Sequence, residues 1–134
     1  MVGIIIVTHC KLADELFEAA ELIVGKIPNC VAVSIDPNEG IDEIGKKVET
    51  AIEFVDRGNG VLILTDLFGG TPSNVSLSFL QDKKVEVLSG VNLPMLLKLS
   101  TSRGDLELRE AARMAKAAGK KNISLASEIM NKRV

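Results

Sequence analysis

The stretch VGIIIVTH, residues 2–9, places six apolar residues in a row and follows them at once with two polar ones. A continuous apolar run of this kind is typical of a strand that is buried on both faces of a parallel sheet. The run is too short to cross a membrane and has neither the basic region nor the cleavage site of a signal peptide. We therefore expect a cytoplasmic protein whose first strand lies inside a sheet.

Outward from this run, apolar β-branched segments alternate with segments of helical period. The expected strands are Val2–Val7, Cys30–Ile35, Val61–Leu64, Lys84–Leu88 and a short final one, Asn122–Leu125. The expected helices are Lys11–Gly25, Ile41–Val55, Ser73–Leu80, Leu93–Ser102 and Leu106–Ala118. This order predicts one α/β domain over residues 1–134, with a doubly wound, mainly parallel four-stranded sheet flanked by helices, plus the C-terminal strand.

Composition excludes several classes of function. The formal net charge is −2 and the charges of both signs are interspersed, which argues against binding to nucleic acid or to an anionic membrane. Aromatic residues make up 3% of the chain and none is Trp or Tyr, so a base-stacking platform or an aromatic sugar cleft is not expected. Cys10 and Cys30 are expected to be free thiols in a reducing compartment.

In an open α/β sheet the ligand site lies beyond the carboxyl ends of the strands, where the strand order reverses. The polar segments at these ends are Thr8–Cys10, Thr65–Thr71 and Ser89–Asn92. His9, the only histidine, could act there as a nucleophile, a general base or a metal ligand. Metal binding is the weakest reading, because Cys10 points to the opposite face of the chain and Cys30 begins its strand at the wrong end.

Asp66 follows the third strand at the same edge and could be either a plain loop carboxylate or a partner of His9. As a partner, it would fix the histidine tautomer, leave the other ring nitrogen free and stabilise the cationic ring. The segment Gly69-Gly70-Thr71-Pro72 could be an ordinary turn or an anion site. In the second case, the N–H groups of Gly70 and Thr71 and the Thr71 hydroxyl would face a phosphoryl group. The spacing and the lysine of a Walker loop are absent.

Three other phosphate-binding or nucleotide-binding classes fail on specific residues. A low-molecular-weight phosphatase needs an arginine six positions after Cys10, where this chain has Leu16. A receiver domain needs acidic residues after the first strand to hold magnesium, and Thr8 and His9 stand there. A dinucleotide-binding turn needs GxGxxG, whereas the sequence reads THCKLA.

Three motifs together resemble a known family. They are IIIVTH at residues 4–9, DLFGGTPSN at residues 66–74 and GVNLPML at residues 90–96. In this order and spacing they are similar to the IIA component of the mannose/sorbose class of the bacterial phosphoenolpyruvate-dependent sugar phosphotransferase system (PTS), over almost the whole chain.

The resemblance implies a phosphocarrier with a transient phosphohistidine at Nε2 of His9. The phosphoryl group would come from the protein HPr and pass to a separate IIB protein. Asp66 would orient His9, and Gly69, Gly70 and Thr71 would bind the phosphoryl group. The remaining motif residues would form the rim that meets the partner proteins: Phe68, Pro72, Asn74, Asn92 and Met95. The family implies a homodimer in which the strand around Asn122–Leu125 is exchanged, and no metal or organic cofactor.

Other functions stay open from the sequence. The same residues would serve a freestanding regulatory module, in which phosphorylation of His9 controls a partner protein. They would also serve the phosphotransfer subunit of a dihydroxyacetone kinase, although the second and third motifs favour the mannose-type reading. A small-molecule-binding α/β domain with a chance histidine is the plainest alternative. The sugar cannot be read from this component.

Overall fold

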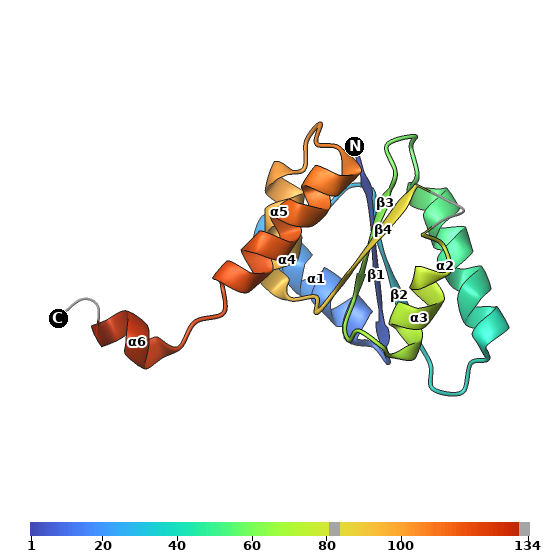
Figure 1. Ribbon diagram of the computed structural model, residues 1–134, viewed down its shortest axis with the longest axis horizontal. Coiled ribbons are helices and arrows are strands. Elements are labelled where there is room, and N and C mark those ends of the chain that lie inside the picture. Colours follow the sequence, from blue (N-terminus) through green and yellow to red (C-terminus); the bar gives the residue numbers. More distant parts are fainter. Residues whose placement is uncertain (81–83, 132–134) are drawn as a thin grey trace.

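The computed structural model describes residues 1–80 and 84–131 (Figure 1). The strands are β1 (Gly3–His9), β2 (Cys30–Ile35), β3 (Val61–Thr65) and β4 (Val85–Ser89). The helices are α1 (Leu12–Val24), α2 (Ile41–Val55), α3 (Thr71–Leu77), α4 (Leu93–Ser102), α5 (Leu108–Lys121) and α6 (Ala126–Asn131). All strand pairs are parallel, in the order β2-β1-β3-β4. The predicted four-stranded parallel α/β fold is confirmed.

Helices cover both faces of the sheet, with α1, α4 and α5 on one side and α2 and α3 on the other (Figure 1). Alternate residues of β1 point to opposite faces of the sheet and pack into two hydrophobic cores, one on each face. Ile4 and Ile6 pack with α1, α4 and α5, whereas Ile5 and Val7 pack with α2. All four side chains are 1% exposed or less, and burial of each contributes about 1.5–3 kcal/mol. The apolar run is continuous because both faces of β1 are covered.

The expected strand Asn122–Leu125 does not form in the single chain. Asn122 ends α5, where its side-chain Nδ2 donates to the Ala118 carbonyl at 2.8 Å. Residues 123–125 have no regular structure and lead into α6, a helix that the sequence pattern did not predict. A strand needs a neighbouring strand to pair with, and α5 carries this segment away from the sheet. In Figure 1, α6 stands apart from the rest of the molecule.

The two edges of the sheet differ. At the β2 edge, Lys47 Nζ donates to the Ser34 carbonyl at 3.0 Å, and the Asp14 backbone N–H donates to the Ser34 hydroxyl at 3.3 Å. Lysine side chains of this kind obstruct the addition of another strand. At the other edge, β4 pairs with β3 on one side, and no strand of the described residues pairs with its second side.

A buried arginine, Arg103, joins the end of α4 to the amino-terminal edge of the sheet. Its side chain is 1% exposed and donates to the carbonyls of Val2 at 2.9 Å and Asn29 at 3.3 Å, and also to the Pro28 carbonyl. The guanidinium thus gives a charged donor to all three carbonyls, of which that of Asn29 also accepts the Ile4 backbone N–H at 3.0 Å. Burial lowers the pKa of the guanidinium from its usual value, and arginine remains charged at neutral pH in any case.

Replacing Arg103 with Met should lower the free energy of unfolding by about 2–4 kcal/mol, because the carbonyls of Val2, Pro28 and Asn29 lose the charged guanidinium donor. Urea denaturation followed by circular dichroism measures this loss. The control is Lys98→Met on the same helix, where the side chain is exposed and the change should stay within about 0.5 kcal/mol. Equal stability of the two variants would contradict the structural role of Arg103.

Candidate functional site

His9 is the last residue of β1 and lies at the carboxyl edge of the sheet, where the order of the strands reverses. β2 flanks β1 on one side and β3 on the other, so the crevice beyond these ends is the switch point of the sheet. The His9 side chain is 48% exposed. The predicted position of His9, at a strand end and open to an incoming group, agrees with the structure.

Thr8 holds the turn between His9 and α1. Its side chain is fully buried, and its hydroxyl accepts the Ala13 backbone N–H at 2.6 Å and donates to the His9 carbonyl at 3.1 Å. Lys11, at the N-cap position, forms no side-chain cap bond, so Thr8 supplies the missing acceptor. The sequence analysis placed Thr8 at this strand end but did not predict its capping role, whose signal is a hydroxyl between a buried strand and the start of a helix.

Asp66 lies directly after β3 and contacts His9 twice with one oxygen. Its Oδ2 is 2.9 Å from the ring Nδ1 and accepts the His9 backbone N–H at 3.0 Å. A carboxylate only accepts hydrogen bonds, so in the neutral imidazole Nδ1 carries the proton and Nε2 keeps its lone pair. The Asp66 side chain is 13% exposed, and its second oxygen, Oδ1, is buried without a hydrogen-bond partner among the described residues. The predicted pairing of His9 with Asp66 is present.

The glycine loop, residues 67–70, lies beside the His9 ring, and one of its expected hydrogen-bond donors is already used. The Gly70 N–H donates to the Leu67 carbonyl at 3.3 Å, so it is used inside the loop and is not free for an anion. The helix begins at Thr71, two residues before the predicted start, because Pro72 fits the first turn. The first N–H groups of a helix lack partners within it, and proline has none, which leaves those of Thr71 and Ser73.

The rim residues divide into two groups. Phe68 is 74% exposed and Asn74 is also exposed, so both lie on the surface near His9, as does Leu67, which sequence reasoning missed. Pro72 and Met95 are buried, which corrects their predicted place on a partner surface.

The Met95 side chain occupies the space that a Cβ on Gly119 would need. Asn92 is half-buried and structural as well: its Oδ1 accepts the Met95 N–H at 3.2 Å, and its Nδ2 donates to the Gly119 carbonyl at 3.2 Å. The third motif therefore fastens α4 to α5 rather than shaping the site. Helix caps and site residues share the same polar residue types, so the sequence alone did not separate them.

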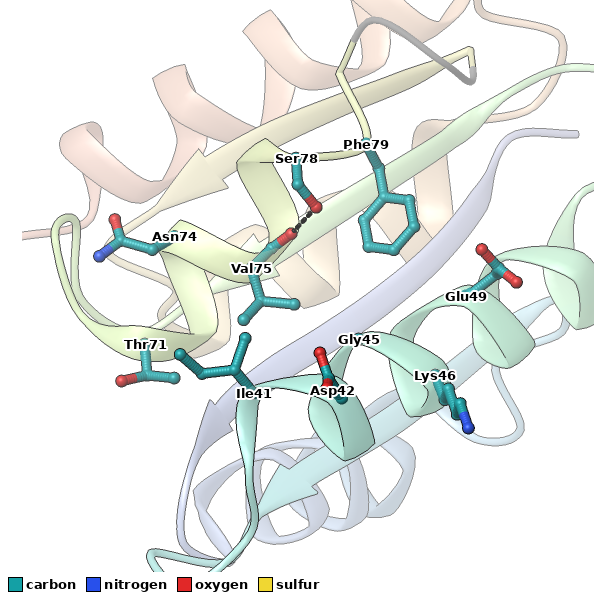
Figure 2. Close-up of a pocket in the computed structure, with 10 residues that line it drawn as sticks. All are labelled: Ile41, Asp42, Gly45, Lys46, Glu49, Thr71, Asn74, Val75, Ser78 and Phe79. Atoms are coloured by element: carbon teal, nitrogen blue, oxygen red, sulfur yellow. Dashed lines mark hydrogen bonds between the residues drawn. The ribbon is translucent and has the colours of Figure 1, made fainter.

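A groove of about 630 Å³ runs between α2 and α3, starting at the site loop (Figure 2). Thr71 and Ile41 lie at one end of it, and Val75 and Phe79 line it further along. The groove thus adjoins the helix that follows the glycine loop. Within residues 1–80 and 84–131, no group of three or more metal-ligating side chains comes together, and no helix has the length and apolar character to cross a bilayer.

Comparison with known proteins identifies the family. Residues 3–116 match the EIIA-man family, described as the PTS system fructose IIA component. The chain belongs to this EIIA family. It is 33% identical to the fructose-specific EIIA component of Bacillus subtilis, over 98% of this chain and 91% of that protein. It is 36% identical to the sorbose-specific EIIA component of Lacticaseibacillus casei, over 80% of this chain and 78% of that protein.

Solved structures agree with this membership. EIIA from Streptococcus agalactiae superposes with a TM-score of 0.87 at 30% identity, over 96% of this chain and 99% of that one. The chain spans about a third of the mannose-specific EIIAB component of Escherichia coli, to which it is 33% identical. As an EIIA protein, the chain is a phosphotransfer component of a sugar PTS, and therefore a transferase component.

The two thiols of this EIIA chain should differ sharply in reactivity. Cys10 is exposed and Cys30 is buried, and both are free. Burial raises the pKa of the Cys30 thiol to about 12, against the smaller opposing effect of the Arg103 charge. A raised pKa keeps the thiol protonated at pH 8, and only the thiolate reacts. Iodoacetamide at pH 8 should therefore modify Cys10 alone in the native protein and both cysteines in urea, as read by mass spectrometry. Native modification of a Cys10→Ser variant would contradict this.

Proposed function

We propose that this EIIA chain accepts a phosphoryl group from phospho-HPr on Nε2 of His9 and passes it to a separate IIB protein. The observation that carries the proposal is the 2.9 Å contact between Asp66 Oδ2 and His9 Nδ1 on a side chain that is 48% exposed, which in the neutral ring leaves the Nε2 lone pair for the reaction. Family membership supports phosphoryl transfer as the reaction. The donor, the acceptor and the phosphorylated nitrogen belong to the proposal.

The transfer balances without a proton entering or leaving the site. The Nε2 lone pair forms the new N–P bond as the N–P bond of the donor phosphohistidine breaks, and the bonding electrons return to the donor nitrogen. The His9 ring thereby becomes cationic, with its proton still on Nδ1. Asp66 stabilises this charge through the hydrogen bond that already exists, so the site needs little reorganisation during the reaction.

The surroundings of His9 favour a protein partner over an enclosed small substrate. His9 is nearly half exposed, and large apolar side chains near it are also exposed: Leu12 by 46%, Leu67 by 61% and Phe68 by 74%. Exposed apolar side chains grouped around a reactive residue are typical of a protein-docking surface. In the proposal, the hydroxyl and N–H of Thr71, the first residue of α3, donate to phosphoryl oxygens.

The proposal extends to a homodimer formed through the C-terminal segment. Apolar side chains of this segment are exposed in the single chain, with Ile123 at 78%, Leu125 at 63% and Met130 at 59%. Within the described residues, no strand pairs with the second side of β4, where the Val87 N–H donates to its neighbour's Glu86 Oε1 at 3.1 Å, so this edge can take a strand from another copy. Residues 122–125, which have no strand partner among the described residues of their own chain, would then pair with the sheet of the second copy.

The relay from phosphoenolpyruvate, enzyme I and HPr tests the transfer. With radiolabelled phosphoenolpyruvate, the native chain should acquire acid-labile phosphate, and His9→Gln should acquire none because the acceptor nitrogen is gone. Labelling of His9→Gln would rule the proposal out. Asp66→Asn should keep the fold and slow transfer by about one to three orders of magnitude, because orientation and charge stabilisation are lost. Asp105→Asn, an exposed aspartate outside the site, serves as the matched control and should transfer at the native rate.

Light scattering coupled to size-exclusion chromatography tests the dimer. The native chain should elute with the mass of two copies, and Ile123→Asp with that of one, because a charge at this position opposes burial in an interface. Phe54→Asp is the control, since Phe54 is also exposed, by 71%, but lies on α2 away from the C-terminal segment. A native chain that is monomeric at high concentration would contradict the dimer and leave the transfer test unaffected.

A further inference from the structure

We propose that Gly70 is a positioning residue for His9: its bare Cα is the surface against which the imidazole rests, and it thereby sets the direction of Nε2. This inference rests on the proposed phosphoryl transfer. A Cβ built on Gly70 would lie 2.8 Å from Cε1 and 3.3 Å from Nε2 of His9. Contacts of 2.8 Å are essentially absent for real Cβ atoms, so any larger residue would displace the ring or the loop.

The ring needs a second contact because its hydrogen bond to Asp66 does not fix its plane. The torsion about the bond to the imidazole is broad, so a single hydrogen bond at Nδ1 leaves the ring free to tilt about the hydrogen-bonded atom. Asp66 holds Nδ1, and Gly70 lies beside the neighbouring ring atoms Cε1 and Nε2. With both contacts in place, Nε2 points in one direction, which an in-line transfer between two protein nitrogens requires.

Short hydrogen-bonded links hold this glycine in place. The Gly70 N–H donates to the Leu67 carbonyl at 3.3 Å, and the Gly70 carbonyl accepts the Asn74 backbone N–H at 2.9 Å. The Asn74 side chain adds a further bond, from Nδ2 to the Gly69 carbonyl at 3.3 Å. Asn74, in the first turn of α3, therefore holds both glycines of the loop through its backbone N–H and its side chain.

The chain contains a matched control for this contact. Gly70 is the N-cap of α3 with φ −80° and ψ 171°, and Gly40 is the N-cap of α2 with φ −77° and ψ 161°. Neither glycine has a side chain that could cap its helix, and a Cβ on Gly40 would meet nothing within 4 Å. Replacing either glycine with Ala makes the same backbone change at the same kind of position. Only Gly70→Ala adds an atom beside the His9 ring.

The experiment compares Gly70→Ala with Gly40→Ala by two readouts. In the relay, Gly70→Ala should accept phosphate about 10- to 100-fold more slowly than Gly40→Ala, since a displacement near 1 Å costs this much. Because His9 is the only histidine, the chain gives a single set of imidazole signals in NMR spectra. The Cε1–H signal and the ring nitrogen shifts should move in Gly70→Ala and stay at the native values in Gly40→Ala. Thermal denaturation verifies that both variants fold.

Native ring signals together with a transfer rate like that of Gly40→Ala would overturn the role of Gly70. If Gly70→Ala does not fold, Asn74→Ala decides, because it loosens the loop without adding an atom. It should slow transfer and broaden the ring signals, relative to Asn38→Ala at an exposed turn position. Native behaviour of Asn74→Ala would then overturn the proposal. A native chain that accepts no phosphate refutes the proposed function, whereas the ring signals still decide whether Gly70 positions His9.

Discussion

One carboxylate oxygen, Oδ2 of Asp66, joins the two central strands of the sheet at the candidate site. It accepts both N–H groups of His9, the backbone one at 3.0 Å and the ring one at 2.9 Å. The first bond fixes where the main chain of His9 leaves β1, and the second fixes the tautomer of its ring. Backbone position and ring chemistry thus depend on the same atom, and removing it would disturb both.

The parallel pairing of β1 and β3 brings His9 and Asp66 together. β1 and β3 pair in parallel with Val7 beside Thr65, so the residues that follow each strand emerge at the same edge. β2 lies on the other side of β1, so the strand order reverses at β1 and His9 stands at the switch point. Apolar packing on both faces of β1 holds this arrangement rigid, and rigidity is what allows a shallow, exposed site to keep a defined geometry.

Residue pattern was enough to predict the sheet, because an uninterrupted apolar strand such as Val2–Val7 has one stable place in an α/β fold. It was also enough to bring His9 and Asp66 together, because both follow buried parallel strands. The limits of prediction lie where a residue type serves two purposes. Asn92 could be a site residue or a helix cap, and only the contacts with Met95 and Gly119 decide for the cap.

Gly70 is a similar case, since a glycine can provide either a free donor or room for a neighbour, and the ring contact is invisible in the sequence. The segment 122–125 has the β-branched and apolar character of a strand, yet a strand exists only when another lies beside it. Whether it pairs therefore depends on the surroundings of the chain and not on its residues alone.

The lysine that blocks the β2 edge has a consequence for how copies of this protein can assemble. If copies pair through their main chains, a strand added at the β2 edge would have to displace the bond from Lys47 to the Ser34 carbonyl, whereas no second strand pairs with β4 within the described residues. A sheet that can be extended on both sides can form an open-ended fibre, whereas one that can be extended on a single side forms a closed pair. A lysine at one edge of the sheet therefore favours a closed assembly over a fibre.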